Sequence, residues 1–174
     1  MAAFCKKTIL YSRLPGLLAL AAHPVRPETH GQTPLVVSEG RLVCDAYPMV
    51  LTQGVHIGAT VVQARRLCPT LIAVPLEQVD VSASLRRLLD TLADLSPVVE
   101  PDGLDAAYVD LMGSPLEATV ESLRAQLLAD FSLSPMIGLG VSRLAAHACA
   151  ESGVVRLEDA AVEWLWPDDS AVVG

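Results

Sequence analysis

The sequence lacks the patterns that mark membrane, secreted and zinc-binding proteins. No run of about 18 uncharged apolar residues occurs, so no segment predicts a membrane-spanning helix. The four cysteines are far apart, with no C-x-x-C pair and no histidine at zinc-ligand spacing. The basic and apolar start is interrupted by Arg13 and Pro15 and has no small-x-small cleavage site, which argues against a signal peptide. We therefore expect a reduced, cytoplasmic protein.

Acidic residues are missing from the start of the chain. No Asp or Glu precedes Glu28, although the 174 residues together have a net charge of -8. Residues 1–70 contain seven basic and three acidic side chains, whereas residues 71–174 contain five basic and seventeen acidic ones, giving +4 and -12. This asymmetry indicates two faces or subdomains with different partners. The alternative is an acidic surface that only keeps the protein in solution.

The apolar patterns predict an α+β fold in which helices cover a sheet. A separate lobe is expected from about residue 12 to 75, because two helix-strand groups flank a small insert. Apolar residues at helical spacing from Glu77 to Leu95 give the clearest helix. The other predicted elements are strands at 8–11, 35–37, 41–44, 71–74, 98–100, 105–112 and 136–139, helices at 14–22, 59–68, 116–127 and 142–150, and a loop at 23–34.

Three stretches together resemble the Y-family (translesion) DNA polymerases. Residues 54–69, GVHIGATVVQARRLCP, are similar to that family's fingers helix, G-V-x-x-G-M-x-x-x-E-A-x-x-L-C-P. Residues 99–111, VEPDGLDAAYVDL, are similar to V-E-x-x-S-I-D-E-A-Y-L-D, and residues 138–146, GLGVSRLAA, to G-I-A-x-N-K-x-L-A-K. Their concurrence in this order is far more specific than any one motif.

The resemblance implies an arrangement of subdomains. Residues 1–12 and 76–166 would form the polymerase palm, a mixed sheet covered by helices. A small fingers subdomain would be inserted at 13–75, and residues 167–174 would begin a truncated thumb.

The carboxylates by which the family holds its metals are mostly replaced. Two-metal nucleotidyl transfer needs carboxylates that fix the ions about 3.5 to 4 Å apart. Family members supply an Asp at the end of the first strand and an adjacent Asp-Glu pair in the hairpin. Here the strand offers Leu10, Tyr11 and Ser12, and the pair is Asp105-Ala106. We predict no metal site, because one carboxylate cannot hold two Mg²⁺ ions, and interpret Asp105 as a catalytic vestige or as a turn residue.

Four other residues are candidates for contact with nucleotide or DNA. Arg143 stands where the family's lysine reaches phosphate, and Tyr47 matches the family's tyrosine if one residue is inserted before Gly54. Arg65 and Arg66 on the fingers helix are candidates for DNA binding. The alternatives are a plain surface arginine, a half-buried tyrosine and a solvated helix face.

These departures predict a non-catalytic protein similar to the Y-family polymerases and to their ImuB-like branch. The resemblance implies an adaptor in DNA repair and error-prone translesion synthesis during damage-induced (SOS) mutagenesis, without a cofactor. Its expected partners are an error-prone replicative-type polymerase and a sliding clamp, the clamp contact lying outside this chain, with weak or absent DNA binding. One alternative is an active translesion polymerase whose atypical Mg²⁺ site uses Asp102, Asp105 and Asp110. Another is an α+β interaction domain without a DNA role.

Overall fold

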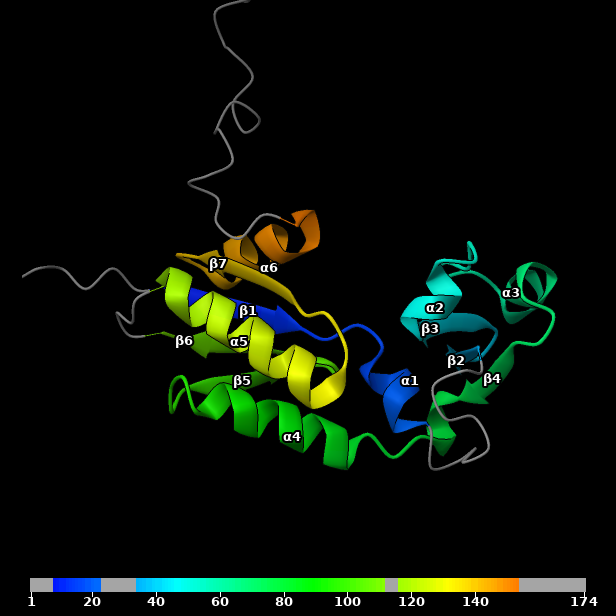
Figure 1. The fold of residues 1–174 in the computed structure, drawn as a ribbon, viewed down its shortest axis with the longest axis horizontal. Coiled ribbons are helices and arrows are strands. Elements are labelled where there is room, and N and C mark those ends of the chain that lie inside the picture. Colours follow the sequence, from blue (N-terminus) through cyan, green and yellow to red (C-terminus); the bar gives the residue numbers. More distant parts are fainter. Residues whose placement is uncertain (1–7, 23–33, 112–115, 154–174) are drawn as a thin grey trace, which may run out of the picture.

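The structure, a computed structural model, describes residues 8–22, 34–111 and 116–153. Its elements form two lobes that lie side by side along the long axis of the molecule (Figure 1). Each lobe is built on its own β-sheet, with helices packed against it. The predicted α+β fold class is therefore confirmed. Within the described ranges, no helix is long and apolar enough to cross a membrane.

The first lobe contains a four-stranded antiparallel sheet. In spatial order its strands are β5 (Val99–Asp102), β6 (Ala106–Asp110), β1 (Ile9–Arg13) and β7 (Met136–Gly140), and its helices are α4 (Ser82–Ala93), α5 (Leu116–Phe131) and α6 (Arg143–Ser152). Helices α4 and α5 cover one face of the sheet, and α6 packs against β7 and β1 on the other (Figure 1). Because β1 lies between β6 and β7, its side chains reach both faces of the lobe near its centre.

The second lobe contains a three-stranded sheet. Its strands, in spatial order, are β3 (Leu42–Ala46), β2 (Leu35–Glu39) and β4 (Ile72–Pro75), and its short helices are α2 (Pro48–Leu51), α3 (Val61–Leu67) and the 3-10 helix η3 (Leu76–Gln78). Strand β2 runs antiparallel to β3 and parallel to β4. Helix α1 (Leu17–Ala21) joins the lobes, because Leu17 is buried in the core of the first lobe and Leu18 in that of the second.

The predicted elements are present with shifted ends. The first strand continues two residues further than predicted, to Arg13. The clearest predicted helix begins at Ser82 instead of Glu77, because η3 comes first and the Asp80 carboxylate then accepts the N–H of Ser82 at 3.0 Å. The cap predicted for α6 is confirmed, since the Ser142 hydroxyl accepts the N–H of Ala145. The predicted loop up to residue 33 and the predicted thumb start lie outside the described residues.

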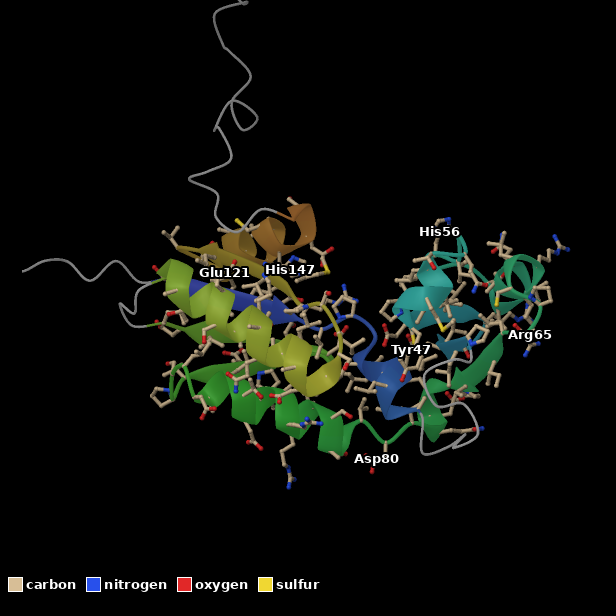
Figure 2. The ribbon with its side chains drawn as sticks, viewed as in Figure 1. Tyr47, His56, Arg65, Asp80, Glu121 and His147 are labelled. Carbon is tan, nitrogen blue, oxygen red and sulfur yellow. The ribbon has the colours of Figure 1, made fainter. Side chains whose placement is uncertain are left out.

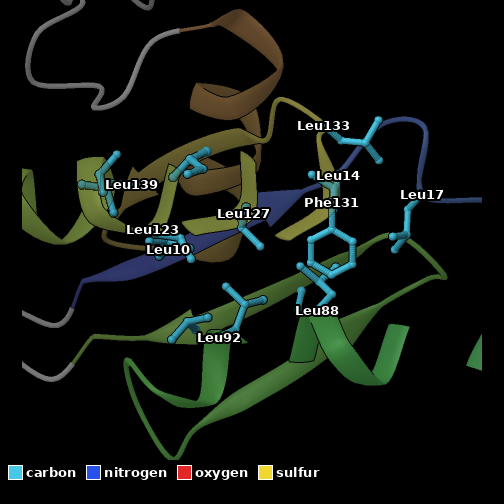
Figure 3. Close-up of a cluster of buried hydrophobic side chains, with 14 of the residues drawn as sticks. Leu10, Leu14, Leu17, Leu88, Leu92, Leu123, Leu127, Phe131, Leu133 and Leu139 are labelled. Carbon is cyan, nitrogen blue, oxygen red and sulfur yellow. The ribbon is translucent and has the colours of Figure 1, made fainter. Parts of the chain in front are cut away.

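Leucine side chains from the sheet and from the helices that cover it fill the core of the first lobe (Figure 3). The alternation predicted for the second hairpin strand is confirmed, because Ala107, Val109 and Leu111 lie in the core of the first lobe, whereas Ala106 and Tyr108 lie on the other face. The fully buried leucines of this core are Leu10, Leu14, Leu17, Leu88, Leu92, Leu111, Leu123, Leu127 and Leu139.

Two glycines allow α6 to lie directly on β7. A Cβ on Gly138 would overlap the carbonyl oxygen of Ala146 and the backbone nitrogen of Ala150, and would lie 2.9 Å from the Cβ of Cys149. Gly140 meets the start of α6 in the same way. The motif glycines of residues 138–146 therefore have a packing role, which is to bring α6 against the open face of the sheet.

We expect Gly138→Ala to lower the free energy of unfolding by at least about 3 kcal/mol, because the backbone atoms it meets cannot move aside as a flexible side chain could. Chemical denaturation followed by circular dichroism measures this loss. The control is Ala148→Gly on the exposed side of α6, which weakens the helix by about 1 kcal/mol without a clash. Equal losses in both variants would contradict the close packing of α6.

Candidate functional site

The side chains of β1 alternate between the core under α4 and α5 and the face of the sheet that carries α6. Leu10 is buried in the core of the first lobe, and Ser12 is wholly buried with a hydroxyl that has no partner among the described residues. Tyr11 lies on the opposite face, where α6 packs. Arg13, two residues on, ends the strand on this same face.

Arg13 occupies the position at the end of the first strand. Its Nε donates to Oδ2 of Asp105 at 2.9 Å, and its Nη1 lies 3.4 Å from Oε1 of Glu151 on α6. The backbone N–H of the next residue, Leu14, donates to the Asp105 carbonyl at 2.8 Å. Burial opposes the charge of Arg13, but the hydrogen bond and the negative charge of Asp105 keep the pKa of the guanidinium above its ordinary value.

The first strand ends beyond the residues considered from the sequence. Leu10, Tyr11 and Ser12 were expected where the family's carboxylate would lie. The strand continues to Arg13, which pairs in register with Ala106, the residue that replaces the second carboxylate of the hairpin motif. Arginine and alanine thus face each other where the Y-family resemblance implies two metal-binding acids.

The metal pair implied by the resemblance does not fit these residues. The side chain of Asp105 is already neutralised by Arg13, and its neighbour Ala106 has no ligand atom. Asp110, the third acid considered, is five residues further along β6, or about 16 Å at the usual rise per residue. Across the described ranges, no group of three or more His, Cys, Asp or Glu side chains is placed to hold a metal ion.

Arg143, the predicted phosphate contact, is engaged by an acid of the first lobe. Its Nη1 donates to Oε1 of Glu100 at 2.7 Å, and its Nη2 donates to the other carboxylate oxygen. The guanidinium also lies 5.4 Å from the centre of the Tyr108 ring. Both members of the ion pair are about half exposed, so the pair sits at the surface beside α6. A phosphate would have to compete with Glu100 for this arginine.

Three aromatic rings gather on the face of the sheet that carries α6. The ring of Tyr11 is 4.9 Å from that of Tyr108 and 4.7 Å from that of His147, which comes from α6. Burial, followed by the negative charge of Asp102, raises the pKa of Tyr11 to about 12. The phenol therefore stays neutral at physiological pH.

The other predicted contacts lie in the second lobe. Tyr47 precedes α2 and is half-buried, and with residues of α1, α4 and α5 it lines a groove of about 500 Å³. Burial, then the charge of Asp45, raises its pKa to about 12. Arg65 and Arg66 lie on the exposed side of α3, and Figure 2 shows Arg65 far from Tyr47. The structure does not bring these residues to Asp105, and their roles stay predictions.

Sequence reasoning missed Asp45, the carboxylate that joins the lobes. Its side chain is 4% exposed and accepts the backbone N–H groups of Gly16 at 2.9 Å and Ala19 at 3.0 Å. Burial raises the pKa of this carboxyl, and the two amide hydrogen bonds oppose the rise. Asp45 comes from β3 of the second lobe, so it holds α1 against that sheet. Gly16, with a φ of +92°, is the sequence signal of the tight turn that presents these amides.

Comparison with known proteins places the chain in a family. Residues 21–151 match the family described as impB/mucB/samB, which is more than half of the chain. The chain belongs to the impB/mucB/samB family. The matched range begins after Arg13, so the strand that carries the departure from the acidic pattern lies before it.

Relatives of this impB/mucB/samB protein are named as polymerases. DNA polymerase IV of Moorella thermoacetica is 31% identical over 139 residues, which are 74% of this chain and 34% of that protein. A structure titled as a Dbh ternary complex has a TM-score of 0.68 at 19% identity over 87% of this chain and 48% of that one. A Y-family DNA polymerase chimera of Dbh and Dpo4 has a TM-score of 0.66 at 19% identity, covering 87% and 49%.

These comparisons confirm the resemblance to the Y-family polymerases and the fold. The chain spans about a third of the length of the Moorella relative and about half of each structural neighbour.

We expect Asp45→Asn to lower the free energy of unfolding by about 2 kcal/mol, since the amide offers one acceptor where the carboxylate offers two to the N–H groups of α1. Urea denaturation measures the change. Glu39→Gln, on the exposed end of β2, removes the same charge without a buried bond and serves as the control. A loss as small as that of the control would contradict the role of Asp45.

Proposed function

We propose that the chain is the palm and fingers of a Y-family DNA polymerase-like protein that acts in DNA damage tolerance without catalysing nucleotide transfer. Family membership and the fold support a place in translesion synthesis. The observation that carries the non-catalytic part is the ion pair of Arg13 with Asp105, formed where metal-binding acids are implied. A positive side chain there repels Mg²⁺ and occupies the carboxylate that would bind it.

The proposed function differs from the polymerase activity that the names of the relatives state. The Moorella protein is named DNA polymerase IV, and that name favours a second candidate, an active translesion polymerase with an unusual metal site. The geometry weighs against this candidate, because Asp105 precedes β6 and Asp110 is the last residue of that strand. We therefore propose that the chain is of the ImuB-like kind and acts as an adaptor in error-prone, damage-induced synthesis in the cytoplasm.

An adaptor needs surfaces that bind other proteins. Large apolar side chains are exposed beside the candidate site, with Leu144 80% and Val141 62% exposed at the start of α6. The two side chains are only three residues apart in the sequence and offer apolar surface that a partner protein could cover. We propose as partners an error-prone replicative-type polymerase and a sliding clamp, with the clamp contact outside this chain and weak DNA binding.

The non-catalytic part is tested by calorimetric titration of dATP into the chain with 5 to 10 mM Mg²⁺ or Mn²⁺ (concentrations on the order used for weak sites). We expect no saturable, metal-dependent heat, because Arg13 holds Asp105. Saturable binding that disappears in Asp105→Ala but persists in Asp90→Asn, a control on the exposed side of α4, would overturn the proposal and favour the polymerase.

The adaptor part is tested with the purified error-prone replicative polymerase from the same cell. We expect it to bind the chain, and Leu144→Asp to weaken this binding at least about tenfold, since a charge replaces an exposed apolar contact. Ser152→Ala, at the other end of α6, is the control. Binding that is absent, or equal in both variants, would count against an adaptor surface on α6.

A further inference from the structure

The end of β1 holds two carboxylates together through one positive side chain. The Asp105 side chain is 16% exposed and Glu151 is 42% exposed, and both lie within ion-pair distance of Arg13. Asp105 is the last residue of the turn before β6, and Glu151 belongs to the last turn of α6. Arg13 therefore links three elements that are far apart in the sequence.

We infer that the Arg13 guanidinium is a resident cation, which stands permanently between the carboxylates in place of the divalent ion of a metal-loaded site. Its single positive charge offsets one of the two negative charges of Asp105 and Glu151, and it ties the hairpin and α6 to the end of β1. The inference deepens the proposed function and rests on it, because a palm that loads no metal still has to neutralise Asp105.

Charge and burial support this role over that of a plain surface ion pair. A carboxylate as covered as Asp105 is costly to leave unpaired, since it has lost much of its contact with water. The pKa of Arg13 is raised despite its burial, so the guanidinium stays charged at any physiological pH. The planar guanidinium can address both acids at once, which the single ammonium of lysine does less well.

The surroundings keep the cation in place. The backbone of Arg13 is paired with Ala106 on one side and Met136 on the other, so the strand cannot withdraw it. The following N–H, of Leu14, is bonded to the carbonyl of Asp105 itself. Asp105 is thus bound to two consecutive residues, through its side chain to Arg13 and through its backbone carbonyl to Leu14.

Removal of the cation should leave an acidic pair that attracts a free one. We expect the melting temperature of Arg13→Ala to be about 5 °C below that of the wild type, and to rise again when millimolar MnCl₂ is added. The wild type should not respond to MnCl₂. Arg13→Lys, which keeps the charge, should recover part of the loss without Mn²⁺. Differential scanning fluorimetry on the whole chain measures all three.

The matched control is Arg124→Ala, which also removes one positive charge and leaves Glu121 without its surface partner on α5. Its melting temperature should change little and should not respond to MnCl₂. If Arg13→Ala does not fold, Arg13→Gln replaces it, because the neutral amide keeps an N–H for Asp105 and is expected to show the same response to Mn²⁺.

Three results would overturn the inference: a melting temperature of Arg13→Ala equal to the wild type, a loss that neither Mn²⁺ nor lysine recovers, or equal stabilisation of wild type and variant by Mn²⁺. The last would mean that metal binds despite Arg13. These results are separate from the proposed function, which is tested by nucleotide heat and partner binding. If Arg13 does not replace a metal ion, the wild type could still fail to bind dATP for another reason, and the proposed function would stand.

Discussion

The alternation of side chains along β1 is the constraint on which the two halves of the candidate site depend. Because β1 is paired on both sides, Leu10 must point to the core under α4 and α5, and Tyr11 and Arg13 must point to the face that carries α6. The same strand thus anchors the leucine core and delivers a guanidinium to Asp105. A shift of one residue would turn Arg13 into the leucine core and Leu10 to the face that carries α6, so the core fixes the ion pair.

A second constraint acts where the chain leaves this strand. Within seven residues the chain is held by Asp105 at Leu14 and by Asp45 at Gly16 and Ala19. One acid belongs to the first lobe and the other to the second, so the connection between the lobes is bonded at both of its ends. The relative placement of the two lobes therefore rests on groups within the chain.

Pattern reasoning found the fold and the family but not the contacts of the site. Helical and alternating spacing located nearly every described element, because burial of one face imposes that spacing on the sequence. The motif at 99–111 and the missing acids are the basis for the prediction that the metal pair is lost. The partner of Asp105 was missed because Arg13 is 92 residues away and lies past the apolar run.

Two further contacts could not have been read from the sequence. The pairing of Arg143 with Glu100 joins positions that only the sheet brings together, and either residue alone looks like an ordinary surface charge. No residue near Asp45 in the sequence indicates that this carboxylate is buried. The one indication is Gly16, which lies 29 residues earlier. Long-range pairs of charged groups depend on register and packing, which single-sequence patterns do not fix.

The central claim is that an internal ion pair stands where the family resemblance implies metal. The most direct measurement is a Mn²⁺ titration of the isotope-labelled chain, with paramagnetic broadening of each backbone amide followed by NMR. The account predicts that amides around Arg13, Asp105 and Ala106 broaden no more than those beside other exposed acids. Selective, saturable broadening centred on Asp105 in the wild-type chain would contradict it.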